Sequence, residues 1–439
     1  MIRDRQTVAK AMRRGLSRAP ESQWRGCQLR VTADALDLVW QMSPHASATF
    51  WMARSGESMA TSGIAHRVKA TGANRFFFVR RQVEKVSRAL ASPGRGPAWT
   101  WVGGFAFAPG QGWPGFGDAL ATLPRWRFWQ ASGQAFLSCI LAPGESADEA
   151  ASEFLGGEAL QEGADPSLAL RMAGARVLQL PQARWSRWVE AALAAIGAEQ
   201  FEKVVLARVA HVQGARAFDV ARVLAHLRAR ASEGTVFAFR EPAGVFMGVT
   251  PERLVRQVGR HLTTEALAGT RPAGTAARVL QRSAKDGREH KVVRDEILES
   301  LRGLGATARA GRTAVRRSGA VMHLHTPIDA TAPRGTHVLD AVAALHPTPA
   351  VAGRPARSAM KWLGAREAEA RGWYAGPVGW FDARGNGEFV VALRSAYLQG
   401  ARARVYSGAG IVTGSDAAAE YEETAWKQRG MLAALGVRE

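Results

Sequence analysis

One stretch near the carboxyl end, residues 405–427 (VYSGAGIVTGSDAAAEYEETAWK), constrains the fold more than any other part of the chain. Its β-branched and small residues predict a strand that runs into a glycine turn before Gly410. Missing side chains at such a turn leave backbone N–H groups free to face a small anion. Ser415 and Asp416, which follow the turn, are typical helix-start residues. The stretch therefore predicts an anion cradle joined to a helix.

The predicted helix carries charge on one face. Glu420, Glu423 and Lys427 recur at spacings of three and four, so their side chains lie on the same side of the helix. This pattern fits a solvated surface helix with a Glu-to-Lys pair. It also fits a face on which two carboxylates and an ammonium group meet a ligand. The segment by itself leaves both interpretations open.

The composition indicates an intracellular globular protein. The 439 residues are 47% hydrophobic, which is ample for the packed core of one or two domains. No window approaches eighteen uninterrupted apolar residues, and the first residues lack the apolar run of a secretory signal. We therefore expect a cytoplasmic protein with no membrane partner. Cys27 and Cys139 match no metal-binding spacing and no disulfide framework, which agrees with a reducing compartment.

The formal net charge of +20 raises the question of nucleic-acid binding. The arginines are spread through the chain rather than clustered, and no nucleic-acid-binding module is recognisable. We interpret the charge as compositional bias and expect no nucleic-acid partner. The same electrostatic field could still help to attract an anionic small molecule.

Residues 1–183 are predicted to be a strand-rich half that carries no assigned chemistry. Apolar runs at 76–79 and 99–107 alternate with turns rich in Gly and Pro. A Gly-Gly pair inside the second run predicts a bulge or a close backbone approach. Residues 141–167 are acidic and rich in Ala and Gly, which predicts a surface excursion or linker.

Residues 184–439 hold a dense series of motifs on regular elements. Hydrophobic periodicity, β-branched runs and turn signals distinguish helices, strands and hairpins here. We expect helices within 182–203, with a glycine near the end, and at 285–304, strands at 201–212, 261–267 and 321–331, and hairpins at 236–250 and within 371–399.

Two residues in this half have both a structural and a chemical interpretation. Lys203 begins a strand, where it either extends to solvent at the sheet edge or is buried and acts as a general base. Glu252 follows Pro251, which fixes the backbone, so it is either a capping acid or a rigidly presented carboxyl group.

Further candidates could bind a metal or an anion. Glu289 begins an amphipathic helix and is either solvated or paired with Glu423 in a site of two carboxylates, which suits Mg²⁺ better than zinc. The small-residue turn around Gly269 offers backbone donors. Arg394, near the end of a strand, has a planar guanidinium group that can bind a carboxylate through two parallel hydrogen bonds. His325, beside His323 on one strand face, reads as an ordinary core or surface histidine.

Taken together, the motifs resemble chorismate-utilising enzymes, and among them most closely the isochorismate synthases. The resemblance covers about residues 185–437 densely and the amino-terminal half loosely. It implies the α+β fold of anthranilate synthase component I, in which a two-layered β-sheet core has helices outside. It also implies that residues 1–183 pack as one unit with the chorismate-binding region at 184–439. The motifs are KVVLAR, FMGVTPERLV, TEALAGT, REHKVV, HPTPAVAG, RGWYAGPVGW, VVALRSA and YSGAGIVTGSD.

The resemblance assigns a role to each candidate. Lys203 corresponds to the base that activates water for attack at C2 of chorismate, and Glu252 to the acid that protonates the departing C4 hydroxyl. Glu289 and Glu423 correspond to the Mg²⁺ ligands, with Glu420 as a helper. The groups expected to bind substrate are Arg394, Lys427, Tyr374 and the backbone of Ala409 and Gly410 for the enolpyruvyl carboxylate, with Gly269, Thr270 and His323 for the remainder.

Three positions narrow the expected reaction within the family. Relatives that use ammonia to form anthranilate differ where this chain has Lys203, so lysine argues for water as the nucleophile. Aminodeoxychorismate synthases carry a lysine at the position of Ala268, and salicylate synthases tend to carry threonine at that of Ala350. We therefore expect a monomeric, Mg²⁺-dependent isochorismate synthase serving menaquinone, siderophore or salicylate synthesis. The alternatives are a salicylate synthase, which releases pyruvate, and a non-catalytic anion- or nucleic-acid-binding protein.

Overall fold

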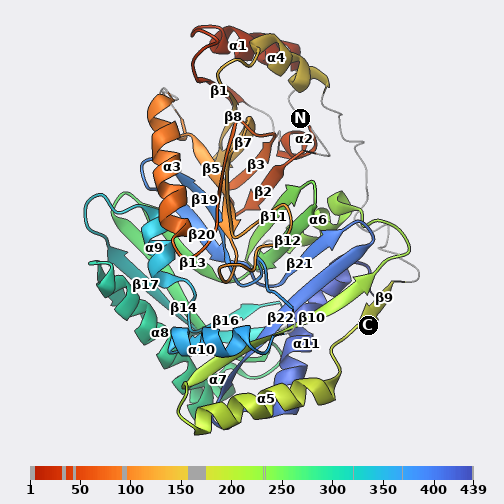
Figure 1. Cartoon of the computed structure of the whole chain (residues 1–439), viewed down its shortest axis with the longest axis vertical. Coiled ribbons are helices and arrows are strands. Elements are labelled where there is room, and N and C mark those ends of the chain that lie inside the picture. Colours follow the sequence, from red (N-terminus) through yellow and green to blue (C-terminus); the bar gives the residue numbers. More distant parts are fainter. Residues whose placement is uncertain are drawn as a thin grey trace.

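Two antiparallel β-sheets form the framework of the protein (Figure 1). The structure is a computed structural model that describes residues 5–31, 36–42, 46–90, 96–156, 175–230, 232, 234–319, 321–367 and 369–437. The first sheet contains, in spatial order, β1 (Arg25–Val31), β8 (Gln134–Leu141), β7 (Trp126–Ala131), β3 (Ser58–Ser62), β2 (Ala48–Met52), β11 (Thr235–Glu241), β12 (Gly244–Thr250), β21 (Ser395–Gln399), β22 (Arg402–Val412), β10 (Lys203–Gln213) and β18 (Gly353–Arg354), with β9 (Arg176–Leu178) also paired to β10.

The second sheet is built in the same way from both halves of the chain. Its order is β15 (Thr307–Ala310), β17 (Val321–Thr331), β14 (His261–Pro272), β13 (Arg253–Val258), β20 (Gly387–Val391), β19 (Pro377–Asp382), β5 (Thr100–Phe105), β6 (Ala119–Leu123) and β4 (His66–Ala70), with β16 (Ala314–Ser318) also paired to β17. Strands from opposite sides of residue 183 pair directly, since β2 pairs with β11 and β5 pairs with β19. The two halves therefore share both sheets.

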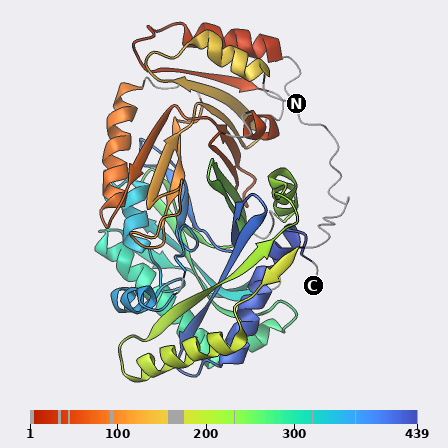
Figure 2. The same cartoon turned by 45° about the vertical axis from the view of Figure 1, so that its right-hand side comes forward.

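Helices lie on the outside of the strands (Figure 2). In Figure 1, α1 and α4 sit at one end of the molecule and α5 at the other, with α8 along the edge between them. No helix in the described ranges is long and apolar enough to cross a membrane. The helices are α1 (Arg5–Leu16), α2 (Leu36–Gln41), α3 (Arg75–Ala89), α4 (Ala147–Gly156), α5 (Gln182–Gly197), α6 (Val220–Arg228), α7 (Ala277–Arg282), α8 (Ala284–Gly303), α9 (Val338–Leu345), α10 (Ala356–Gly364) and α11 (Ala417–Ala434).

Alternate side chains of the strands point into two different hydrophobic cores. Trp51 and the facing Phe237 belong to the core that contains side chains of both sheets. Their neighbours Phe50 and Ala238 belong to a second core, which lies under α1, α2 and α4. Successive residues of a strand point to opposite faces, so each strand contributes to both layers. The predicted two-layered α+β architecture is confirmed.

Two expectations for the amino-terminal half are wrong. Residues 76–79 belong to the helix α3 rather than to a strand. Phe76 and Val79 are buried at helical spacing, while Phe77 is 60% exposed, so helical periodicity accounts for the run. The acidic stretch is not simply a surface excursion, because α4 buries Phe154 within it. The remainder of that stretch, from residue 157, lies outside the described ranges.

The expected glycine turns are also corrected. β22 does not end before Gly410 but continues to Val412, because its pairing with β10 extends over its full length. β14 likewise continues past the expected turn to Pro272, with a register shift at Gly269, whose φ of +69° suits glycine. Arg394 lies in the connection between β20 and β21 rather than in a strand.

The Gly-Gly pair in β5 does mark a close backbone approach. A Cβ atom on Gly103 would lie 1.9 Å from the carbonyl oxygen of Leu120 in the paired strand β6. Backbone cannot yield as a flexible side chain does, so even one methyl group forces the strands apart.

We predict that Gly103→Ala lowers the free energy of unfolding by about 1–3 kcal/mol, measured by urea denaturation. Gly197→Ala is the matched control, because its added methyl group at the end of α5 would meet no atom within 4 Å. The control should stay within about 0.5 kcal/mol of the parent protein or be slightly more stable. Equal effects of the two substitutions would contradict the close approach.

Candidate active site

The pairing of β10 with β22 creates the floor of a cavity. Val205 lies opposite Gly410, and Ala207 lies opposite Gly408, so all four face the same side of the sheet. Because the two glycines have no side chains, the space above them stays open. A Cβ atom on Gly410 would lie only 2.9 Å from Cε of Lys203, so glycine is the residue that leaves this room.

A single cavity gathers eleven of the thirteen residues that the sequence nominated. They come from β10, β14, β17, β22, α8, α11 and the connecting segments. The exceptions are Glu420, which does not line the cavity, and Ala409, which is buried on the opposite face of β22 from the two glycines. The residues around the cavity are Lys203, Glu252, Gly269, Thr270, Glu289, His323, Tyr374, Arg394, Gly410, Glu423 and Lys427.

Lys203 is buried, so it does not extend to solvent at the sheet edge. Only 1% of the residue is exposed, and its Nζ donates to Oε1 of Glu289 on α8 at 2.9 Å. Burial alone would raise the pKa of Glu289, but the cationic Lys203, with Lys427 and Lys285 behind it, lowers that pKa. The base candidate and the metal-ligand candidate are thus joined as an ion pair between a buried ammonium group and a partly buried carboxylate.

Glu252 has the opposite electrostatic character. It directly precedes β13 and is 6% exposed. Burial, reinforced by the negative charge of Glu265, raises the pKa of Glu252 to about 8, against the influence of Lys203 and other cations. A carboxyl group with such a pKa is protonated at neutral pH and is suited to donate a proton.

Three carboxylates on two helices lie close enough to influence one another, and two of them, Glu289 and Glu423, line the cavity. Glu423 accepts from Lys427 Nζ at 2.6 Å, and Glu420 accepts from Lys285 Nζ at 2.9 Å. Burial and the charge of Glu423 raise the pKa of Glu420, and Glu289 contributes to the same shift. Within the described ranges, no group of three or more His, Cys, Asp or Glu residues is arranged to hold a metal ion. The described side chains therefore do not form a complete metal cage.

Other polar groups of the cavity suit an anionic ligand. His323 lies 3.1 Å from the Thr270 hydroxyl through Nδ1, and its Nε2 lies 3.3 Å from the guanidinium of Arg394. Burial and the Arg394 charge lower the pKa of His323, so its imidazole is neutral and can accept from Arg394. Lys427 Nζ also donates to the carbonyl oxygen of Gly408 at 2.8 Å, which holds the ammonium group beside this glycine of β22.

The structure adds residues that the sequence interpretation missed. Arg371 lines the cavity and braces β10 by donating to the carbonyl oxygen of Val205 at 2.6 Å. Its place in the RGWYAG motif was the available signal. Glu265 stands in the TEALAGT motif, but its effect on Glu252, like that of Lys285 on Glu420, had no local signal because each pair meets only in the folded chain.

Comparisons with known proteins identify the family of this chain. The family described as chorismate binding enzyme matches residues 16–436. The salicylate biosynthesis isochorismate synthase of Pseudomonas aeruginosa is 38% identical over 262 residues, which cover 57% of this chain but only 54% of that relative. Isochorismate synthase MenF of Bacillus subtilis is 31% identical over 355 residues, which cover 76% of this chain and 74% of the relative.

Solved structures share the fold over nearly the whole chain. Menaquinone-specific isochorismate synthase MenF from Escherichia coli matches with a TM-score of 0.81 and 26% identity, covering 98% of this chain and 100% of its own. Anthranilate synthase component I from Streptococcus pneumoniae matches with a TM-score of 0.69 and 19% identity, covering 85% of this chain and 92% of its own. The expected anthranilate synthase component I fold is confirmed.

We predict that Lys203→Met lowers the free energy of unfolding by about 2–4 kcal/mol, because it leaves the Glu289 carboxylate, whose side chain is 15% exposed, without its partner. The measurement is urea denaturation at pH 7. Lys291→Met on the same helix as Glu289 is the matched control, since Lys291 forms an exposed pair with Asp295 and should cost less than about 1 kcal/mol. Equal losses in both variants would contradict a buried ion pair.

Proposed function

The chain belongs to the chorismate-binding enzyme family, and from this premise we propose that it is an isochorismate synthase that converts chorismate to isochorismate. The observation that carries the proposal is the cavity that brings buried Lys203 and protonated Glu252 together beside cationic and carboxylate groups. Support also comes from the two relatives named isochorismate synthase, which are 38% and 31% identical to this chain.

Lys203 and Glu252 divide the proton transfers between them. For this step Lys203 must first give up the proton that it holds in its ion pair with Glu289, and the resulting neutral amine takes a proton from water as the water oxygen bonds to C2 of the ring. The ring double bonds shift, the C4–O bond breaks, and Glu252 gives its proton to the departing hydroxyl, which leaves as water. A carboxyl group with a pKa of about 8 holds the required proton at neutral pH. Oxygen lost from C4 is thus replaced by oxygen from solvent at C2.

Cationic and neutral donors hold the substrate dianion in this scheme. Arg394 and Lys427 offset the charge of the enolpyruvyl carboxylate, whose unpaired burial would be costly. Tyr374 and the backbone around Ala409 and Gly410 complete that end. Gly269, Thr270 and His323 line the remainder of the ring pocket.

The carboxylates fit a hard divalent cation such as Mg²⁺. Glu289 and Glu423 would hold it, with Glu420 supporting them, because Glu289 and Glu423 line the cavity and the charges of both act on Glu420. Mg²⁺ usually keeps several waters and takes only one or two protein carboxylates, which agrees with the absence of a larger cluster among the described residues. When bound, the ion supplies positive charge that neutralises these carboxylates and the ring carboxylate of the substrate.

Two alanines at the cavity restrict further chemistry after the hydroxyl transfer. Ala268 and Ala350 both line it. Ala268 offers no amine to attack the ring. Ala350 lacks the hydroxyl that salicylate synthases tend to carry at this position, so the reaction stops at isochorismate. Pyruvate release would instead indicate the salicylate synthase alternative.

We predict that the purified protein converts chorismate to isochorismate in the presence of Mg²⁺, releases no pyruvate, and loses turnover in a chelator. Chromatography of products with a pyruvate assay on the same sample provides the measurement. Lys203→Ala and Glu252→Gln should each reduce kcat by at least about a hundredfold, because each removes a proton-transfer group. Unchanged chorismate under all conditions would support the non-catalytic anion-binding alternative.

We further predict that turnover declines as the pH rises through about 8, because Glu252 must be protonated and its pKa is raised to about 8. The profile of kcat against pH, recorded from pH 6 to 9.5 at saturating chorismate and Mg²⁺, tests this. A rate that keeps increasing across pH 8 would be inconsistent with Glu252 as the acid.

A further inference from the structure

The backbone on both sides of Glu252 is held by one pair of side chains. Glu265 Oε1 accepts the backbone N–H of Arg253 at 2.9 Å. Arg316 donates to Oε2 of Glu265 at 2.6 Å and also to the carbonyl oxygen of Pro251. The residue before Glu252 and the residue after it are therefore tied to the same ion pair.

Three strands of the second sheet build this cluster. Glu265 comes from β14, Arg316 from β16 and His325 from β17, and Nε2 of His325 lies 2.9 Å from Oε2 of Glu265. Their side chains are only 10%, 17% and 19% exposed. None of the three lines the cavity, so none of them is placed to touch a bound substrate there.

The main chain of Glu252 is fixed by two further contacts. Its N–H donates to the hydroxyl of Thr250 at 3.3 Å, and its carbonyl oxygen accepts the N–H of Val391 at 3.1 Å. The backbone is thus anchored to β12, β14, β16 and β20, while the carboxyl group extends into the cavity. A proton donor held in this way keeps its distance to a bound substrate, which proton transfer requires.

The charges around Glu252 oppose one another. Lys203 on β10, Arg316 on β16 and Lys427 on α11 favour its ionised form, whereas Glu265 favours its protonated form. Arg394, His323, Glu289 and Glu423 line the same cavity. Although burial opposes it, the hydrogen bond with His325 and the charge of Arg316 lower the pKa of Glu265 to about 2. Glu265 therefore stays negative throughout the range in which Glu252 titrates.

We propose that Glu265, fixed by Arg316 and His325, is a positioning residue that holds Glu252 in place and in its acid form for proton donation to the substrate. The inference rests on the proposed function, because Glu265 acts only through Glu252. Its chemistry differs from that of an ordinary structural ion pair, since the negative charge itself contributes to the reaction.

The first test is Glu265→Gln, which keeps the size and the acceptor for the Arg253 N–H but removes the charge. We expect the alkaline limb of the kcat profile to move downward by on the order of one pH unit. Such a shift lowers kcat about fivefold at pH 8 and much less at pH 6, with little change in the KM for chorismate. Recovery at low pH is a response that a purely structural role would not produce.

The second test is Arg316→Lys, which keeps the positive charge but cannot span both Glu265 and the Pro251 carbonyl oxygen as the guanidinium does. We expect a loss of kcat at every pH with the alkaline limb unmoved. This variant keeps the proposal testable if Glu265→Gln fails to fold, which thermal unfolding will show.

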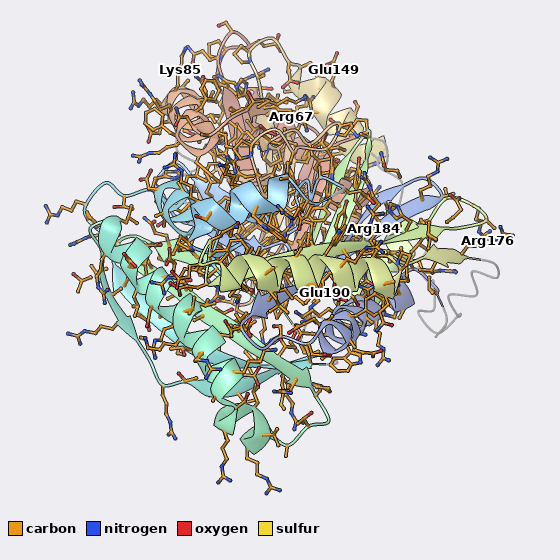
Figure 3. All side chains as sticks on the ribbon, turned by 60° about the horizontal axis from the view of Figure 1, so that its bottom comes forward. Arg67, Lys85, Glu149, Arg176, Arg184 and Glu190 are labelled. Carbon is orange, nitrogen blue, oxygen red and sulfur yellow. The ribbon has the colours of Figure 1, made fainter. Side chains whose placement is uncertain are left out.

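Glu241→Gln is the matched control. Glu241 is 7% exposed and accepts from Arg67 and from the Ser47 hydroxyl, both at 2.8 Å, but it lies at the end of β11 and does not line the cavity. In Figure 3, Arg67 lies in the upper part of the view with Lys85 and Glu149, away from α5, which carries Arg184 and Glu190. The control should lose stability without any shift of the pH profile.

The outcomes separate this proposal from the one on which it rests. A complete lack of chorismate turnover by the wild-type protein would contradict the proposed function. Wild-type turnover combined with an unmoved alkaline limb in Glu265→Gln overturns the role of the Glu265 charge. A kcat unchanged at all pH values in Arg316→Lys overturns the positioning role.

Discussion

The active site depends on the register between β10 and β22. The pairing sets Val205 opposite Gly410 and Ala207 opposite Gly408, so one face of the sheet is empty where the substrate would lie. A slip of one residue would turn the glycines to the other face and close this space with side chains. The same register places Lys203 at the edge of the hollow. The cavity is therefore a property of strand pairing and not of a flexible loop.

Burial acts to raise the pKa of both Glu252 and Glu289, and neighbouring charges decide the result. Glu289 is paired with Lys203, and its pKa is lowered despite burial. Glu252 lies near cations as well, but Glu265 offsets part of their influence and its pKa rises to about 8. Two carboxyl groups in one cavity thus take opposite protonation states at neutral pH. That division suits one of them to bind cations and the other to donate a proton.

Local sequence patterns predicted the elements whose periodicity can be read from their own residues, such as the helix that carries Glu289 and the strand that begins at Lys203. They failed where pairing with a distant strand decides the structure. The small residues before Gly410 indicated a turn, but pairing with β10 holds them in a strand. The cluster of Glu265 and Arg316 was also invisible, since its members meet only through the pairing of three strands. The resemblance of the motifs to a known family identified the candidate site residues, and long-range contacts bring those residues together.

The central claim is that solvent supplies the new hydroxyl group while the C4 hydroxyl leaves as water. Turnover of unlabelled chorismate in ¹⁸O-labelled water, followed by mass spectrometry of the isochorismate, tests this claim most directly. The account predicts one ¹⁸O atom in each product molecule, located at the C2 hydroxyl. Product that retains only the original oxygen would show that the hydroxyl migrates within the substrate, and water activation by Lys203 would then be wrong.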